Sequence, residues 1–153
     1  MYHYLIVICL FVKIQWRLKM IKEKQPGINF ENIILKDLSF TRKPEMLNKL
    51  ELSIELDNNI SFSEKKDKLT YELICSINDA NDSFKINCTM VGIFSIISEE
   101  KNMDLTQFAN NNAPALIFPY IREIIATTTL KAGIQSVLMP PLNIYALINK
   151  KNK

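Results

Sequence analysis

Three cysteines and one histidine are the side chains of this sequence best suited to act as nucleophiles, bases or metal ligands. Cys9, Cys75 and Cys88 lack the CxxC spacing of zinc sites, and their odd number does not fit a disulfide framework. Cys75 and Cys88 fall in strand-like runs, where a free thiol behaves as a small buried hydrophobe. A bridge between these two is the alternative. Free thiols favour a reducing, cytoplasmic location.

Acid–base chemistry has equally little support. The only histidine, His3, lies in an N-terminal segment unlike the rest of the chain. Glu51 and Glu55 fall on the solvated face of a predicted strand, while Arg122 and Glu123 are neighbours on a predicted helix, and neither pair has a partner base. The phosphate-binding patterns GxGxxG and GxxxxGK[ST] do not occur. We therefore expect no enzyme, no cofactor and no metal.

Length and composition favour one soluble domain. The chain has 153 residues, of which 48% are hydrophobic and 23% charged. The net charge of +3 comes from Lys13, Arg17 and Lys19, because residues 20–153 carry 16 basic and 16 acidic residues. A neutral body lacks the basic stripe of a nucleic-acid-binding protein, so we expect no nucleic acid as a partner.

Residues 1–19, MYHYLIVICLFVKIQWRLK, form a separate apolar segment. The run from Tyr4 to Val12 is too short to cross ~30 Å of hydrocarbon as a helix. Its positive charges follow the apolar run and no A-x-A-like cleavage site is present, unlike in a signal peptide. The favoured interpretation is an upstream extension, with Met20 as the true start. A membrane anchor and an added element of the fold are the alternatives.

Four runs after the Pro26-Gly27 break predict β-strands. Residues 32–41 form the first, with Ile34, Leu38 and Phe40 on one face. Residues 50–56 alternate without error between apolar and polar side chains, the signature of a half-buried strand. Asp57 to Asn59 is expected to end or bulge this strand before the alternation resumes. Residues 69–77 and 84–98 are the third and fourth strands.

The connections and one glycine complete the prediction of the sheet. The segment 63–68 is a charged turn, and residues 78–83 are rich in the Asn and Asp of tight turns. Gly92, inside the fourth strand, indicates a bulge or a close backbone approach. Short polar connections between four strands predict an antiparallel sheet.

After residue 98 the pattern becomes helical. Asp104 and Gln107 are spaced as a capping box, and the asparagines at 110–112 interrupt the helix that follows. Pro114 suits the first position of a second helix, in which Pro119 should cause a kink or delay the regular part. One face of that helix is predicted to be lined by Ile117, Ile121, Ile124 or Ile125, and Thr128. Gly133 is the predicted C′ residue that ends the helix.

The C-terminal part is predicted as an apolar linker at 134–142, followed by a short helix at 144–148 with Asn143 as its cap. Strands followed by helices give an α+β domain. The helices can cover only one face of the sheet. The remaining apolar surface should therefore be buried in an oligomer or offered to a partner.

Three blocks of this sequence resemble the SecB family of export chaperones. The stretch NAPALIFPYIREII…LKAG…PPLNIYAL follows the family pattern P-x-x-L-F-P-Y-x-R-x-x-I, then G, then P-V-N-F-x-A-L. KDLSF at 36–40 is similar to the first-strand motif, and GIFSI at 92–96 to the end of the fourth strand. The residues on the C-terminal pattern are Pro114, Phe118, Pro119, Tyr120, Arg122, Ile125, Gly133, Pro141, Asn143, Ala146 and Leu147.

The resemblance implies a four-stranded antiparallel sheet with helices packed on one face, in a chaperone domain spanning residues 20–153. It implies a homotetramer, a dimer of dimers with helices between the sheets. It further implies an ATP-independent holdase that binds unfolded or precursor polypeptides in apolar grooves. The positions matching those grooves are Met46, Leu47, Leu52, Ile54, Leu56, Phe118, Tyr120, Leu138, Leu142, Ile144 and Tyr145, each of which ordinary core or interface packing could also explain.

The sequence departs from the family where the translocase motor SecA binds. Asp37 matches the first acidic position of that surface, but later positions read Thr41, Lys85 and Asn87, and the tail is short and basic. The altered charge removes electrostatic complementarity, so SecA contact is doubtful. The resemblance leaves a second interpretation: a SecB-like chaperone dedicated to one partner, such as an antitoxin.

Overall fold

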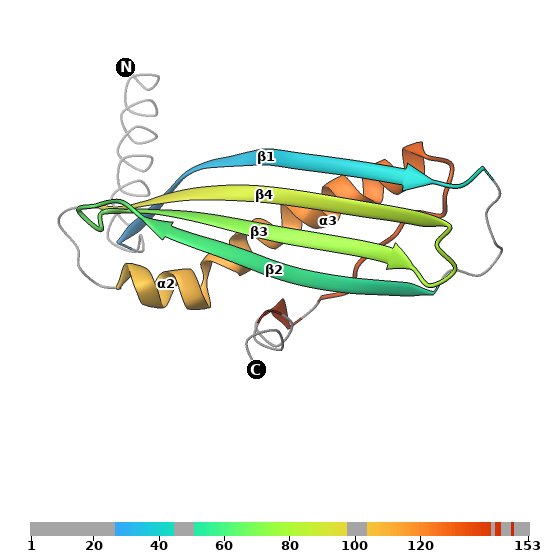
Figure 1. Ribbon diagram of the computed structural model, residues 1–153. Coiled ribbons are helices and arrows are strands. Elements are labelled where there is room, and N and C mark those ends of the chain that lie inside the picture. The colour runs from blue at the N-terminus through green and yellow to red at the C-terminus, as the bar shows by residue number, and fades with distance from the viewer. Residues whose placement is uncertain (1–26, 45–50, 98–103, 142, 145–147, 149–153) are drawn as a thin grey trace, which may run out of the picture.

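The structure, a computed structural model, describes residues 27–44, 51–97, 104–141, 143, 144 and 148. Among these residues, four long strands come first and the helices α2 and α3 follow (Figure 1). Residues 1–19, and with them the interpretation of that segment, lie outside the described residues. The elements are β1 (Ile28–Arg42), β2 (Leu52–Phe62), β3 (Lys68–Asp79), β4 (Phe84–Ile96), α2 (Leu105–Asn111) and α3 (Ala113–Lys131).

The strands form one antiparallel sheet in the order β1-β4-β3-β2. The two central strands, β3 and β4, are hairpin neighbours, and β1 and β2 are the two edges. Helix α3 lies behind β3 and β4 in Figure 1 and packs against both. The predicted α+β class and the antiparallel sheet followed by helices on one face are therefore confirmed.

Strand β2 is longer than its clearest sequence signal. It runs without interruption from Leu52 to Phe62 and keeps a continuous register with β3. The predicted break at Asp57 to Asn59 was wrong, because the pairing to β3 supplies backbone hydrogen bonds through this stretch whatever its turn propensity.

Two bulges make β1 irregular. The register with β4 shifts between Phe30 and Asn32 and again between Leu35 and Asp37, so Glu31 and Lys36 are extra residues. A bulge moves every following side chain to the other face of the sheet. Leu38 and Phe40 consequently face α3 whereas Ile34, opposite Val91, faces away. The prediction that all three share a face was wrong.

Both predicted turns are present. Ser63 Oγ accepts the backbone amides of Asp67 and Lys68, and Lys66 adopts φ +53°. In the other turn, Asp82 adopts φ +56°, a conformation that Asp tolerates well. Asp79 is buried there and accepts the amides of Glu51 and Ser83. Burial raises its pKa, but the hydrogen bonds from the Ser83 side chain and from backbone amides, including those of Glu51 and Ser83, outweigh burial, and the pKa of Asp79 is lowered.

The core lies between α3 and the central strands. The side chains of β3 and β4 that point toward α3, every second one along each strand, are buried except for the half-buried Ile96, and they include Tyr71, Leu73, Cys75 and Cys88. Gly92 lies where the helix comes nearest. A Cβ there would meet Ile117 Cδ1 and Phe94 Cε2, each at 2.8 Å. The close approach predicted for Gly92 is confirmed, and both bulges belong to β1 instead.

The helices begin where predicted, with different details. Asp104 is the N-cap of α2 but makes no capping hydrogen bond with its side chain, so the predicted capping box was wrong. Pro114 occupies the first turn of α3, as expected. Pro119 lies inside α3, which nevertheless starts at Ala113, so the regular part is not delayed. The buried face follows a four-residue spacing: Ile117, Ile121, Ile125 and Thr129. Of the two predicted alternatives Ile125 is the buried one, and the prediction of Thr128 was wrong by one residue.

The end of α3 is closed by a Schellman motif. Gly133, at φ +71°, donates its amide to Leu130 O, and Ile134 donates to Thr129 O. The predicted C′ role of Gly133 is confirmed. Residues 134–141 continue without regular structure, as expected for the linker. Of the predicted last helix, Ile144 and Ile148 are described, helical and buried.

Candidate functional site

The sheet is wider than the helix that covers it. On the side that faces α3, both edge strands carry large apolar side chains that remain between 37% and 44% exposed. Their cross-strand partners place them on this side. These uncovered apolar side chains on the two edge strands are candidates for an interaction surface. We name these residues the β1 strip, Leu35 and Leu38, and the β2 strip, Leu52, Ile60 and Phe62.

Helix α3 presents a second apolar surface. Leu116 and Tyr120, four residues apart, project from one side of the helix, and Leu130 lies on the same side. This side is opposite to the buried row that begins at Ile117. We name Leu116, Tyr120 and Leu130 the outer face of α3.

The linker adds the most exposed large apolar side chain of the described residues. It leaves the end of α3 near β1 and runs behind the sheet toward the β2 edge (Figure 1). Val137 and Met139 are buried, whereas Leu138 between them is 77% exposed. An extended backbone alternates its side chains, so two anchoring residues hold Leu138 outward.

The structure separates the predicted groove residues by burial. Leu52, Tyr120 and Leu138 are exposed, and Ile54 is half-buried. Leu56, Phe118 and Ile144 are buried within the single chain. Residues Met46, Leu47, Leu142 and Tyr145 lie outside the described residues.

The other exposed apolar residues of these surfaces were not among the groove residues predicted from the sequence. The β1 strip was missed because the bulges of β1 hide its alternation. Ile60 and Phe62 were within reach, since the alternation that starts before Leu52 continues through them. Leu116 lies next to the buried Ile117, and no pattern in the sequence distinguishes it as an exposed residue.

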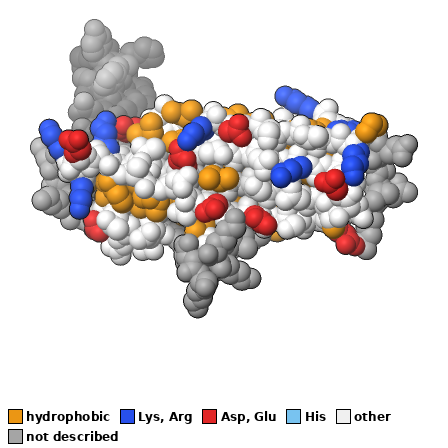
Figure 2. All heavy atoms as spheres, viewed as in Figure 1, with side chains coloured by type: hydrophobic (Ala, Val, Ile, Leu, Met, Phe, Trp, Pro, Cys, Tyr) orange, Lys and Arg blue, Asp and Glu red, His pale blue; other side chains and the backbone are white. Residues whose placement is uncertain are grey.

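The opposite face of the sheet carries charged side chains of both signs and polar groups, with apolar side chains such as Ile34 between them (Figure 2). The two bulged residues of β1 reach charged partners on β3: Lys36 Nζ lies 2.5 Å from Glu72 Oε1, and Lys68 Nζ lies 3.4 Å from Glu31 Oε1. Hydrogen bonds from Lys36 and from Asn59 lower the pKa of Glu72.

The four positions relevant to SecA gather on this polar face. Thr41 pairs with Lys85, and Asp37 lies on the same face of β1. Asn87 Nδ2 donates to Ser39 Oγ at 3.2 Å. Asp37 thus shares its surface with neutral residues and a lysine, instead of an acidic cluster.

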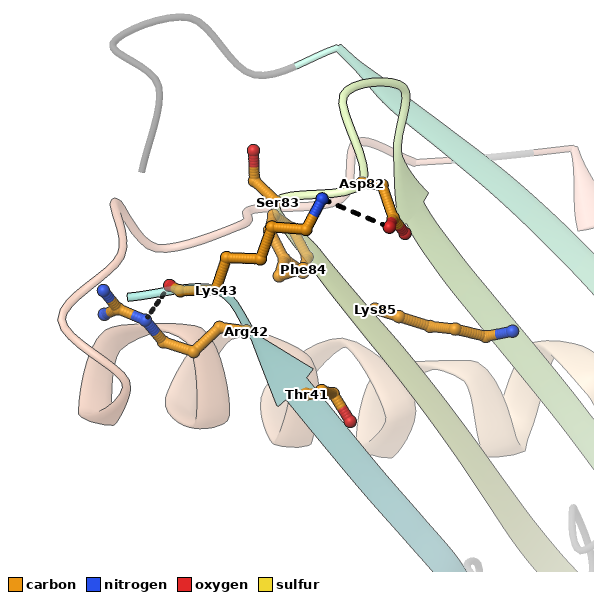
Figure 3. Close-up of a pocket in the computed structure, with 7 residues that line it drawn as sticks. All are labelled: Thr41, Arg42, Lys43, Asp82, Ser83, Phe84 and Lys85. Atoms are coloured by element: carbon orange, nitrogen blue, oxygen red, sulfur yellow. Dashed lines mark hydrogen bonds and ion pairs between the residues drawn. The ribbon is translucent and has the colours of Figure 1, made fainter. Parts of the chain in front are cut away.

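A small hollow opens where β1 and the β3–β4 turn meet (Figure 3). Its volume is about 120 Å³, well below the several hundred Å³ typical of small-molecule sites. The Lys43 ammonium pairs with Asp82 Oδ2 at 3.3 Å. The Arg42 guanidinium donates hydrogen bonds to backbone carbonyls instead. The lining residues are Thr41, Arg42, Lys43, Asp82, Ser83, Phe84 and Lys85.

The two thiols are inert neighbours. Cys75 and Cys88 lie opposite each other in the β3–β4 register, and both are free and fully buried. Burial raises the pKa of Cys75 to about 12 and that of Cys88 to about 11. Nucleophilic thiols need a lowered pKa. The interpretation as small hydrophobes is confirmed, and the alternative of a bridge was wrong.

The described residues contain neither a cluster of metal-ligating side chains nor a helix that could span a membrane. Within them, no three His, Cys, Asp or Glu side chains gather as metal ligands would. Nor does any helix in that part of the chain have the length and apolar character needed to cross a membrane.

Comparison with known proteins gives a consistent picture. The profile of the family described as "Preprotein translocase subunit SecB" matches residues 21–153. Uncharacterized protein MJ0357 of Methanocaldococcus jannaschii is 29% identical over 129 residues, covering 80% of this chain and 83% of the relative. Protein-export protein SecB of Rickettsia typhi is 31% identical over 141 residues, covering 84% of this chain and 90% of the relative.

A solved structure has a similar fold. It is the Rv1957 SecB-like chaperone of Mycobacterium tuberculosis, in complex with a ChAD peptide from the Rv1956 HigA1 antitoxin. The TM-score is 0.66 at 15% identity, with 76% of this chain and 91% of that chain covered.

Proposed function

The chain belongs to the SecB family of protein-export chaperones, and we propose that it is an ATP-independent holdase for unfolded or precursor polypeptides. The observation that carries the proposal is the set of large apolar side chains left exposed on the edge strand β2 and on the linker: the β2 strip and Leu138. A folded partner would need a complementary shape. An unfolded chain needs only apolar side chains and can adapt its backbone to the surface.

Binding of an unfolded chain to these exposed apolar side chains is driven by burial of apolar area. Each Å² removed from water contributes about 25 cal/mol before the ordering of the bound chain is subtracted. Because several separate contacts are made, no single client sequence is required. Slow-folding chains expose apolar segments for longest and would be selected kinetically.

The outer face of α3 supports the assembly in this proposal. A dimer of dimers with helices between the sheets would bury Leu116, Tyr120 and Leu130 against the same residues of another copy. This assigns Tyr120 to the interface. The β2 strip and Leu138 would stay open to clients.

The first prediction tests the holdase activity with the native protein, prepared with and without residues 1–19. Both forms should be tetramers by light scattering and should suppress the aggregation of a denatured client at equimolar tetramer without ATP. Leu138→Ser should weaken client binding at least about tenfold, since burying a leucine contributes roughly 1.5–3 kcal/mol and about 1.4 kcal/mol is a factor of ten.

The matched control is Gln135→Ser, an exposed linker position that should bind clients as the parent does. Leu138 is already exposed in the free chain, so its replacement should leave the melting temperature unchanged. A parent chain that is monomeric and does not suppress aggregation would contradict the holdase proposal.

A second candidate function is a chaperone dedicated to one partner. It is favoured by the loss of acidic residues around Asp37 and by the antitoxin peptide bound to the Mycobacterium relative. An antitoxin encoded beside this chain would be the preferred client. The fold and groove would be the same in both cases.

The second prediction separates these functions. An export chaperone should retain SecA in a pull-down, and Asp37→Lys should abolish that retention by reversing the charge at the shared surface. The control is Asp57→Lys, which lies on β2 but on the same polar face of the sheet as Asp37. The control variant should retain SecA. Absence of SecA binding by the parent would favour the dedicated chaperone, and equal loss with both variants would argue against a specific role for Asp37.

A further inference from the structure

Thr129 is a fully buried polar side chain in the last turns of α3. Its hydroxyl donates to the carbonyl of Ile125 at 2.8 Å, and Ala126 O lies at 3.1 Å from the same oxygen. A threonine inside a helix often satisfies its hydroxyl in this way. The hydroxyl oxygen also accepts the backbone amide of Val137 at 3.0 Å. Thr129 therefore joins the helix to the linker.

A second hydrogen bond supports the same contact. Ser136 Oγ donates to Ala126 O at 3.1 Å. Together the two bonds hold consecutive linker residues against the last turns of α3, and the next residue along the chain is Leu138. Val137 and Met139, on either side of it, are buried, whereas Leu138 is exposed. The bonded amide thus lies one residue before the side chain assigned to client binding.

Apolar burial alone selects this arrangement less strictly. Hydrophobic contact is non-directional, and a leucine suits an apolar environment as well as a valine or a methionine does. In an extended backbone, a slip of one residue exchanges the side chains that face inward with those that face outward. Such a slip would bury Leu138 and expose its two neighbours.

The hydrogen bond to Thr129 opposes that slip. The slip would separate the Val137 amide from the Thr129 hydroxyl, and a buried amide without an acceptor is costly. A hydrogen bond joins one particular donor to one particular acceptor, so it fixes a register that apolar burial specifies only in part.

We propose that Thr129 is a positioning residue for client binding: by accepting the Val137 amide, its hydroxyl sets the register of the linker and keeps Leu138 on the outside. The inference rests on the proposed holdase function. Because Thr129 is fully buried, it acts through Leu138 and does not touch the client.

The test measures the dissociation constant of the full chain for a fluorescent unfolded client, well below the melting temperature of each variant. Thr129→Val keeps the branched shape but removes the hydroxyl. It should weaken binding about three- to tenfold, the range that one neutral hydrogen bond covers. Thr129→Ser keeps the hydroxyl and should stay within about twofold of the parent.

The matched control is Thr127→Val on the same helix. The Thr127 hydroxyl donates to Glu123 Oε1 at 3.0 Å, a contact between two residues of α3. Its removal takes away the same chemical group without touching the linker, so this variant should bind clients as the parent does.

A double-mutant cycle distinguishes positioning from general stability. If Thr129 acts through Leu138, adding Thr129→Val to Leu138→Ser should weaken binding by less than about twofold further. Full additivity of these two changes would overturn the proposal. So would parent-like binding by Thr129→Val, or a loss with Thr129→Ser as large as that with Thr129→Val.

Hydrogen exchange keeps the inference separate from the proposed function. In the free protein, Thr129→Val should accelerate exchange of the Val137 amide at least about threefold, whereas Thr129→Ser and Thr127→Val should not. The amides of β3 should stay protected in every variant. A parent chain that bound no client would contradict the holdase proposal. Exchange at Val137 would still decide the contact with the linker, because an unchanged rate in Thr129→Val would overturn the inference.

Discussion

Replacing Leu116 and Tyr120 together by glutamate is expected to divide the proposed tetramer into dimers. Both residues lie on the outer face of α3 and are exposed in the single chain, so the substitutions should not disturb its fold. In a helix-to-helix interface, each copy would bring two unpaired carboxylates into a desolvated layer. Leaving one buried charge without a partner costs roughly 3–5 kcal/mol, so dissociation should rise by more than a hundredfold.

Light scattering at several protein concentrations measures this result directly. The matched control is Asn81→Glu with Ser61→Glu, which adds the same charge at two exposed positions away from α3. The control should stay assembled. If the Leu116→Glu, Tyr120→Glu protein kept the parent's mass and melting temperature, the outer face of α3 would not be the interface.

Replacing Gly92 by valine is expected to produce the largest loss of folding stability. The added Cβ would meet Ile117 Cδ1 and Phe94 Cε2 at 2.8 Å, and both neighbours are completely buried. Both side chains lie in the core between α3 and β4, so they would have to rotate within packed surroundings to make room. Overpacking of this kind costs about 1–3 kcal/mol and occasionally more. Gly92→Ala should fall in that range, and Gly92→Val at its upper end or above.

The physical cause can be checked with a compensating change. Ile117→Ala alone should destabilise by about 2–5 kcal/mol, because it leaves a cavity in the core. Combined with Gly92→Val, the cavity and the added methyl groups should offset each other, so the double variant should be more stable than the sum of both losses. Chemical denaturation of all four proteins gives the coupling. Strict additivity would show that the clash with Ile117 is not the cause.

The elements of the sheet were predictable because their signals are local. The alternation beginning before Leu52 and the turn residues at 78–83 depend on neighbours two or three positions away, and they predicted strands and turns that the structure confirms. The same holds for Gly133, whose conformation is required by the end of a helix. Gly92 was predicted to mark either a bulge or a close approach; only the structure decided for the approach, because Ile117 is far away in sequence.

The errors arise where pairing or packing overrides local preference. Asp57 to Asn59 are turn formers, yet the ladder to β3 keeps them extended. The bulges of β1 depend on its fit to β4, so the face of Ile34 could not be read from spacing. Asp104 begins a helix without using its side chain as a cap.

The candidate site shows the same division. The sequence by itself determined which apolar residues exist, how the strands alternate, and the resemblance to the SecB family. Only the tertiary structure decided which of those residues stay uncovered: Leu56 and Phe118 are buried, while Leu52 and Leu138 are exposed. The reason is geometric. Exposure depends on the width of α3 relative to the sheet and on the path of the linker, and these are set by long-range packing that no local pattern encodes.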